Sequence, residues 1–171
     1  MLRLLYRIKL EREIRKRGRF PEHIVVIGSN FGNKFKDFVD WCEKFGIKEI
    51  TICTKKKFDF DCLKSEKVRI NVVNFSGKEE IVEAIRKIAE KVLSGEIKVE
   101  EINEELFESL LSLRSQPDLI VKAGKEIPDF LIWQSIYSEL LFTDVDWETI
   151  RYIDFLRIIR EYQGRERRYG R

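Results

Sequence analysis

A glycine-rich loop is the first segment of the sequence that could bind a phosphorylated ligand. It spans residues 28–33 and joins the apolar stretch 23–27 to a stretch with helical spacing. Backbone N–H groups of such a loop, together with the dipole of the following helix, can hold a phosphate. The loop matches neither the Walker nor the dinucleotide fingerprint, so a plain turn stays open as the alternative. The residues expected to form this residual phosphate site are Gly28, Ser29, Asn30 and Gly32.

The segment 165–171 is a second candidate anion site. It reads Arg-Glu-Arg-Arg-Tyr-Gly-Arg, with four basic side chains and one acidic side chain. Guanidinium groups bind phosphate through paired hydrogen bonds, and the glycine at position 170 gives the backbone freedom to place them. From charge alone, the segment is either a mobile anion clamp or a frayed polar tail.

Few other residue types indicate chemistry. Glu139 lies at a predicted helix-to-strand turn, where a carboxylate could ligate magnesium beside a diphosphate, although a lone carboxylate more often faces solvent. The single histidine, His23, has no arrangement of cysteine or serine nearby that would make a nucleophile, so we expect a structural role. Cys42, Cys53 and Cys62 form no Cys-x-x-Cys pair, which argues against a disulfide framework and against a zinc site.

Length and composition indicate one domain, residues 1–171, with a single core: 43% of the 171 residues are hydrophobic. No apolar run is long enough to cross a bilayer and no signal-peptide pattern is present, so a cytoplasmic location is expected. Residues 1–19 hold eight basic and two acidic side chains, whereas the middle of the chain is net negative. This distribution argues against a nucleic-acid-binding surface. The basic amphipathic helix expected over 1–19 either faces solvent or contacts an anionic membrane surface peripherally.

Strand-like and helix-like stretches alternate along the chain. This alternation predicts an α/β domain with a mostly parallel central sheet that is flanked by helices. In such folds ligands bind at the carboxyl ends of the strands, which is where the loop 28–33 would lie. The expected strands are 23–27, 49–53, 68–75, 118–122 and 140–142, and the expected helices are 1–18, 35–45, 76–93, 103–113, 128–137 and 147–162.

Several stretches, in the same order from end to end, resemble the cis-prenyltransferases, the family of undecaprenyl and dehydrodolichyl diphosphate synthases. The resemblance implies that family's fold. It also implies a reaction in which isopentenyl diphosphate is condensed onto an allylic diphosphate with magnesium, using an aspartate in the loop after the first strand and a glutamate matched here by Glu139. The most specific stretches are residues 21–27, 75–78, 117–124, 129–134, 137–140, 142–145 and 165–170.

The chain departs from the family pattern at three places. The loop aspartate of the family falls on Gly28 or Ser29, neither of which can hold a cation. An arginine at the diphosphate-binding strand end is matched by Lys122, which binds phosphate less specifically. Finally, two long helices that wall the product tunnel of active members are replaced by the polar connection 54–67.

These departures are similar to those of the Nogo-B receptor-like auxiliary subunits of heteromeric cis-prenyltransferases. In those complexes a terminal Arg-x-Gly helps to bind isopentenyl diphosphate in the active site of the catalytic subunit. The resemblance implies a non-catalytic subunit of a heterodimer or heterotetramer that makes long-chain polyprenyl diphosphate. Arg168, Tyr169 and Gly170 would contact the diphosphate in trans, and Mg²⁺ would be held in the partner's site rather than by this chain.

The same resemblance places the subunit interface in the region of Trp133, Tyr137 and Trp147. Two other readings stay open. In the first, the chain is a homodimeric short-chain prenyltransferase that uses Glu139 and a water network in place of the lost aspartate. In the second, it binds a phosphorylated ligand or a membrane without any transferase partner.

Overall fold

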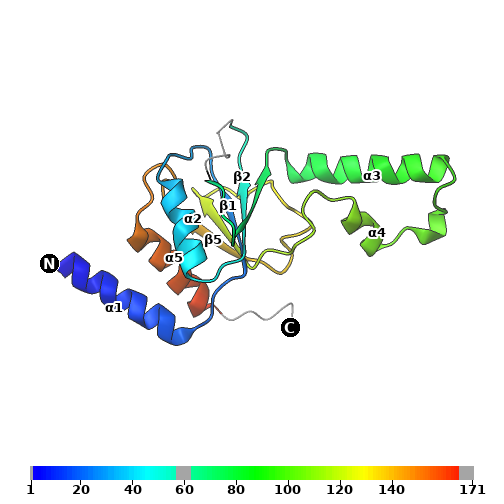
Figure 1. Cartoon of the computed structure of the whole chain (residues 1–171). Coiled ribbons are helices and arrows are strands. Elements are labelled where there is room, and N and C mark those ends of the chain that lie inside the picture. Colours follow the sequence, from blue (N-terminus) through cyan, green and yellow to red (C-terminus); the bar gives the residue numbers. More distant parts are fainter. Residues whose placement is uncertain (1, 57–62, 166–171) are drawn as a thin grey trace.

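A computed structural model describes residues 2–56 and 63–165 of the chain. In these ranges five parallel strands form one sheet in the order β3-β2-β1-β4-β5 (Figure 1). The expected α/β fold with a mostly parallel central sheet is therefore confirmed. The strands are β1 (His23–Ile27), β2 (Glu49–Cys53), β3 (Arg69–Val73), β4 (Leu119–Ala123) and β5 (Glu139–Thr143).

The central strand β1 pairs with both β2 and β4. All five of its residues are buried, because helices cover both faces of the sheet and the strand is apolar throughout. The register aligns Ile27, the last residue of β1, with Cys53 of β2 and with Lys122 of β4. The carboxyl ends of these three strands therefore lie together at one edge of the sheet.

Three helices, α1 (Leu2–Arg17), α2 (Phe35–Lys44) and α5 (Tyr152–Gly164), cover one face of the sheet (Figure 1). Aromatic side chains fill the larger core between them, with Phe38 lying 5.8 Å from Phe155 and 5.6 Å from Trp147 between ring centres. Edge-to-face packing of this kind adds to the free energy gained by burying the rings. Only the second half of α1 joins this core, through Leu10 and Ile14.

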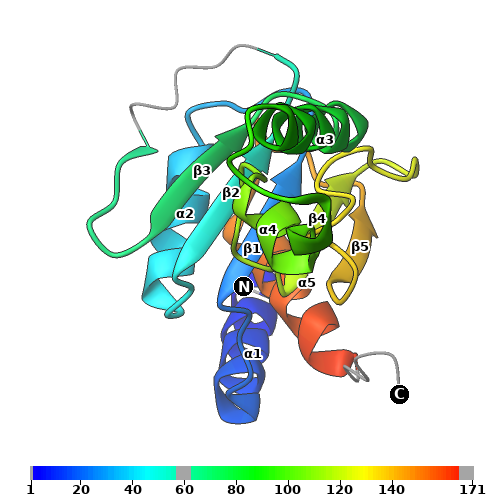
Figure 2. The ribbon, with the colours of Figure 1, turned by 90° about the vertical axis from the view of Figure 1, so that its right-hand side faces the viewer.

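The other face carries α3 (Gly77–Leu93), the short helix η2 (Val99–Glu101) and α4 (Glu104–Ser109). The helix expected over 76–93 opens with a capping box in which Ser76 and Glu79 exchange hydrogen bonds. The helix then extends away from the sheet as an arm (Figures 1 and 2). Apolar side chains at helical spacing remain exposed along it, namely Val82 (54%), Ile85 (55%) and Leu93 (88%).

The helix predicted over 128–137 is wrong. The segment consists of turns, because Leu131 adopts a left-handed conformation with φ of 51° that an α-helix cannot contain. Tertiary contacts hold it there: the N–H of Gly77 donates to the carbonyl of Asp129 at 2.6 Å, and the Gln134 amide donates to the Leu113 carbonyl at 3.2 Å.

The helix predicted over 147–162 begins only at Tyr152. Trp147 precedes it as a buried core residue with 1% of its surface exposed, which corrects the expectation that it lies at a subunit interface. Asp146 stabilises a turn at this point by accepting hydrogen bonds from the Glu148 N–H and the Thr149 hydroxyl. The helix predicted over 103–113 is likewise shorter, since α4 ends at Ser109.

No helix within 2–56 and 63–165 is both long and apolar enough to cross a membrane. His23 fills the structural role expected for it. The ring is buried at the start of β1, where its Nε2 lies 2.8 Å from the hydroxyl of Thr51. Burial lowers the pKa of His23, and the negative charge of Glu49 offsets this effect only in part.

This burial makes stability depend on pH. A histidine in an unfolded chain titrates near about pH 6.5, so below that value the unfolded state binds a proton that the folded state excludes. His23 therefore contributes no penalty above about pH 6.5 and destabilises the fold as the pH falls towards its lowered pKa. We expect His23→Gln, which retains a partner for Thr51, to lose less thermal stability than the wild type between about pH 7.5 and about pH 5.5. Equal losses in the melting temperatures of the two proteins would refute this assignment.

Candidate functional site

The carboxyl edge of the sheet brings together most of the candidate anion-binding residues. The loop 28–33 follows β1 at the point where the strand order turns from β2 to β4, which is the usual ligand position in open α/β sheets. Lys122 of β4 is level with Ile27, one residue before this loop. The N–H of Gly28 continues the ladder by donating to the carbonyl of Cys53 at 3.2 Å.

The indole of Trp147 packs directly on Gly28. Its Nε1 donates to the carbonyl of Ile27 at 3.2 Å, and a Cβ built on Gly28 would lie 2.8 Å from the same nitrogen. Gly32 is equally close to Glu148, whose carbonyl oxygen would lie 2.9 Å from an added Cβ. Both glycines are thus required for close approach to the segment before α5, and neither has a positive φ.

This packing distinguishes the two positions, 28 and 29, that could match the family's aspartate. Position 28 has no room for a side chain, whereas Ser29 is exposed. Of the two positions left open by the sequence, only 29 could carry a carboxylate without displacing Trp147. The packing therefore favours Ser29 over Gly28 as the residue that matches the family's aspartate.

The start of α2 is less available to an anion than expected. The N–H groups of Phe35, Lys36 and Asp37 already donate to carbonyls of the preceding turn, those of residues 32–34. A phosphate bound here would have to use N–H groups nearer the start of the loop, together with lysine side chains. Helix-dipole attraction would still favour an anion at this end of α2.

Two lysines that sequence reasoning missed lie beside the loop. Lys56 follows β2 and its Nζ donates to the Asn30 side-chain carbonyl at 2.8 Å. Lys55 lies over the ring of Phe130, with 6.0 Å between Nζ and the ring centre. Hydrogen bonds with Ser76 lower the pKa of Glu79, and the charge of Lys55 adds to the effect. Two lysines directly after a predicted parallel strand were the signal for this placement.

Lys122 belongs to the same basic edge. Its Nζ donates to the carbonyl of Ala123 at 2.6 Å, which keeps the ammonium group close to the end of β4. Together with Lys55 and Lys56 it gives the loop region several cations and no carboxylate within residues 28–33. Such an edge can attract a phosphate or diphosphate by charge, but it lacks a bidentate guanidinium at Lys122.

Glu139 lies at the opposite edge of the sheet from the loop. It is the first residue of β5 and is level with Leu119, so roughly 13 Å of strand separates it from the carboxyl edge. Its carboxylate faces Arg165, whose guanidinium lies 3.5 Å away and also donates to the carbonyl of Leu140 at 2.7 Å. Within one chain, Glu139 cannot complete a site with Ser29.

The residues present do not fit a resident magnesium ion. Octahedral Mg²⁺ binding needs carboxylate or phosphate oxygens, whereas the loop offers a serine and Glu139 is engaged with Arg165 far from it. Across the described ranges, no three His, Cys, Asp or Glu side chains gather in a group that could hold a metal ion. No step of a reaction is therefore assigned to a metal on this chain.

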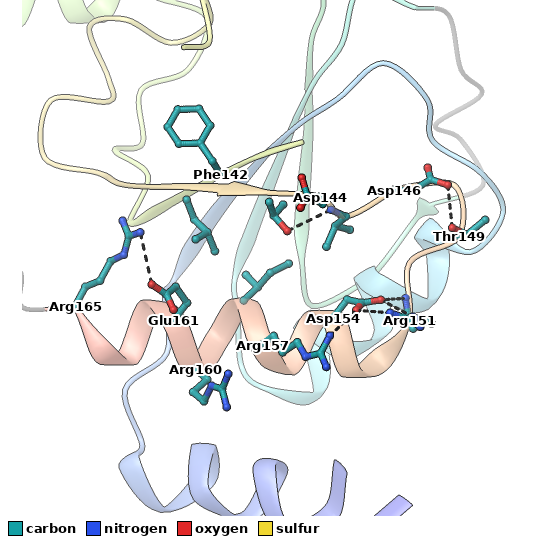
Figure 3. Close-up of a pocket in the computed structure, with 14 residues that line it drawn as sticks. Phe142, Asp144, Asp146, Thr149, Arg151, Asp154, Arg157, Arg160, Glu161 and Arg165 are labelled. Atoms are coloured by element: carbon teal, nitrogen blue, oxygen red, sulfur yellow. Dashed lines mark hydrogen bonds and ion pairs between the residues drawn. The ribbon is translucent and has the colours of Figure 1, made fainter. Parts of the chain in front are cut away.

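The tail residues Arg168, Tyr169 and Gly170 lie outside the described ranges. The residue from which they continue is well anchored, because Arg165 also lies 3.8 Å from Glu161 in an ion pair. Figure 3 shows this pair at one end of a cavity of about 910 Å³ between β5 and α5. The cavity has walls of mixed charge, and none of the loop 28–33 lines it.

Comparison with known proteins connects this geometry to one family. The profile of a family described as putative undecaprenyl diphosphate synthase matches residues 59–170. A tritrans,polycis-undecaprenyl-diphosphate synthase (geranylgeranyl-diphosphate specific) from Picrophilus torridus is 46% identical over 122 residues, which cover 68% of this chain and 48% of that protein. A protein of the same name from Pyrococcus horikoshii is 30% identical over 235 positions, which cover 91% of this chain and 89% of that protein.

The Pyrococcus alignment is longer than this chain. Since 91% of the 171 residues amounts to about 156, roughly 80 of the 235 positions have no counterpart in this chain. With the Picrophilus protein, the chain matches less than half of the relative's length.

The fold agrees with solved structures. Lavandulyl diphosphate synthase from Lavandula x intermedia, crystallised with dimethylallyl diphosphate, superposes with a TM-score of 0.74 over 88% of this chain and 98% of that one, at 21% identity. This similarity concerns the fold alone, whereas the sequence matches above concern descent. Together with the parallel sheet and the loop at its carboxyl edge, they place the chain in the cis-prenyltransferase family of undecaprenyl diphosphate synthases.

Proposed function

We propose that this chain is a non-catalytic auxiliary subunit of a heteromeric cis-prenyltransferase that makes long-chain polyprenyl diphosphate. The observation that carries the proposal is the state of the loop after β1. Ser29 stands where a carboxylate is needed, Trp147 excludes any side chain at Gly28, and Glu139 is paired with Arg165 at the opposite edge. The family fold is retained, but the groups that would act on a diphosphate are not brought together.

The tail is the part of the chain that this proposal puts to use. Arg165 is fixed to β5, so the Cα of Arg168 can lie at most about 10 Å from that of Arg165, and the arginine side chain extends the reach of the guanidinium further. A guanidinium on such a short tether, followed by Gly170, suits an anion at the surface of a second subunit. In the proposal, Arg168, Tyr169 and Gly170 contact the diphosphate of isopentenyl diphosphate, while the partner holds Mg²⁺ and the allylic substrate.

The exposed apolar surface of the second face is the proposed contact with the catalytic subunit. It consists of the stripe along α3 and of the neighbouring turn, where Ile132, Ile136 and Tyr137 are all exposed. Trp133 contributes less, since its indole packs on Phe107 of α4 at 4.6 Å between ring centres. An apolar surface of this kind is typical of an interface core rather than of a free monomer.

A second candidate, a homodimeric prenyltransferase, is favoured by one observation. Relatives at 30% identity or more carry the names of undecaprenyl diphosphate synthases specific for geranylgeranyl diphosphate. In a homodimer, Glu139 of one subunit could approach the loop of the other. The absence of a carboxylate at position 29 argues against this candidate, and the assay below separates the two.

The first prediction concerns activity in trans. We expect the purified chain to be inactive with isopentenyl diphosphate and either farnesyl or geranylgeranyl diphosphate, and to raise the turnover of a full-length cis-prenyltransferase from the same genome. Arg168→Ala should increase the KM for isopentenyl diphosphate about tenfold or more while the complex stays intact, because a charge-assisted contact is lost. Arg171→Ala is the matched control. Product formation by the chain alone would overturn the auxiliary role, and unchanged kinetics of Arg168→Ala would overturn the tail assignment.

The second prediction concerns the contact surface. Ile85→Asp with Ile136→Asp places charges in the proposed interface core and should weaken the complex at least about tenfold, as measured by isothermal titration. Leu5→Asp is the control, because this leucine is equally exposed but lies on α1, across the sheet from α3. An affinity equal to that of the control would show that the stripe on α3 is not the contact.

The third prediction tests the packing of the loop. Gly28→Asp forces a side chain against the indole of Trp147 and should cost about 1–3 kcal/mol of unfolding free energy. Ser29→Asp adds the same carboxylate at an exposed position and should change stability by less than about 0.5 kcal/mol. Urea denaturation of the two variants measures the difference. Equal stabilities would mean that the indole does not occupy the position described.

A further inference from the structure

Helix α1 has apolar side chains on two opposite faces. Leu10 and Ile14 face the sheet and are almost fully buried. Leu4, Leu5 and Ile8 lie in the first half of the helix and are 50%, 58% and 39% exposed. The inward pair accounts for how the helix packs, whereas the outward three contribute nothing to the core. Their exposure therefore needs a different explanation.

The outward face also concentrates positive charge. At 100° per residue, Lys9, Arg12 and Lys16 project from the same side of α1 as the outward leucines. No ion pair is recorded for these three within residues 2–56 and 63–165. The two acidic residues of the helix are neutralised elsewhere: Glu11 pairs with Arg15 at 3.1 Å and Glu13 with Arg17 at 2.8 Å. The outward face is thus apolar and cationic, with no acidic side chain.

A basic notch lies on the other side of α1, where the helix faces α5. A cavity of about 530 Å³ between the two helices is lined by apolar side chains and by Arg7, Arg151 and Arg157. The guanidinium of Arg7 lies over the ring of Tyr152, 5.9 Å from its centre. Arg160, which points towards α1 in Figure 3, donates to the Tyr6 hydroxyl at 3.3 Å. Arg151 and Arg157 both pair with Asp154, the latter at 3.7 Å, so their charges are offset within the notch.

The position of α1 leaves this face accessible to a large flat partner. Its amino-terminal half extends beyond the sheet, on the side opposite to the α3 arm (Figure 1). A surface that approaches α1 from outside would meet neither the arm nor the carboxyl edge of the sheet. Such an approach is possible while a second subunit covers α3.

We propose that the outward face of α1 docks on a bilayer that contains anionic phospholipid. Leu4, Leu5 and Ile8 insert among the headgroups, while Lys9, Arg12 and Lys16 contact lipid phosphates. Charge complementarity selects this occupant, because a face with apolar centre and only basic surroundings matches an anionic interface better than a protein surface of mixed charge.

Vesicle sedimentation with the full chain tests the proposal. We expect the protein to sediment with vesicles of phosphatidylcholine and phosphatidylglycerol but not with phosphatidylcholine alone, and to be released by about 0.5 M salt, which screens surface charge. Two triple variants should each reduce binding about tenfold or more, because apolar insertion and electrostatic attraction are both required. They are Leu4→Ser/Leu5→Ser/Ile8→Ser and Lys9→Gln/Arg12→Gln/Lys16→Gln. The control Val82→Ser/Ile85→Ser/Leu93→Ser removes three exposed apolar residues from α3 and should bind as the wild type does.

Three outcomes would overturn the proposal. The first is no binding to the anionic vesicles, and the second is equal binding by the α1 variants and the α3 control. The third is self-association of the chain in analytical ultracentrifugation that disappears in the leucine variant, which would assign the face to a second copy. The measurement uses the chain without prenyl substrates or partner. Its failure would leave the auxiliary-subunit proposal intact, and failure of that proposal would leave this one standing.

Discussion

The contact between the indole of Trp147 and the backbone at Gly28 determines how the functional end of this molecule is built. The ring donates to the last carbonyl of β1 and lies against Phe31, Phe35 and Phe38, so one side chain joins the central strand, the loop, α2 and the approach to α5. Burial of such a large residue is worth several ordinary core contacts. The shape of the loop consequently depends on this contact rather than on the residues at its exposed positions.

The parts of the fold that follow from local physics could be predicted from the sequence. The strands 23–27 and 49–53 were predicted with the bounds that the structure has, because continuous apolar runs between turn signals leave little choice in a parallel sheet. The start of a helix at Ser76 was predicted from the sequence as well. The segment 128–137 was not, because its turns depend on a buried cluster in which Gln134 donates to Glu80 of α3 at 3.2 Å, far away in sequence. The burial of Trp147 was not predicted for the same reason, because an apolar helical pattern does not show which side chain enters the core.

The candidate site shows the same division. Position in the chain correctly brought Lys122 and the loop to one edge, since both follow from strand direction. The place of Glu139 also follows from strand direction, because it precedes the strand expected over 140–142. Its pairing with Arg165 could not be predicted, because the two residues are distant in sequence. The structure starts β5 at Glu139, one residue earlier than the pattern indicates, and this residue therefore lies at the amino edge with Arg165. The resemblance to the family supplied the candidate residues, whereas the strand register determined which of them lie near one another.

The two helices that leave the body, α1 and α3, do so on opposite sides of a sheet whose central strand is completely buried. A five-stranded parallel sheet with packed faces resists bending, because its interior is close-packed. The surfaces that contact α1 and α3 would consequently be held at one fixed spacing and orientation. In the proposed complex, the chain would act as a rigid bracket that sets the height and tilt of the catalytic subunit relative to the membrane.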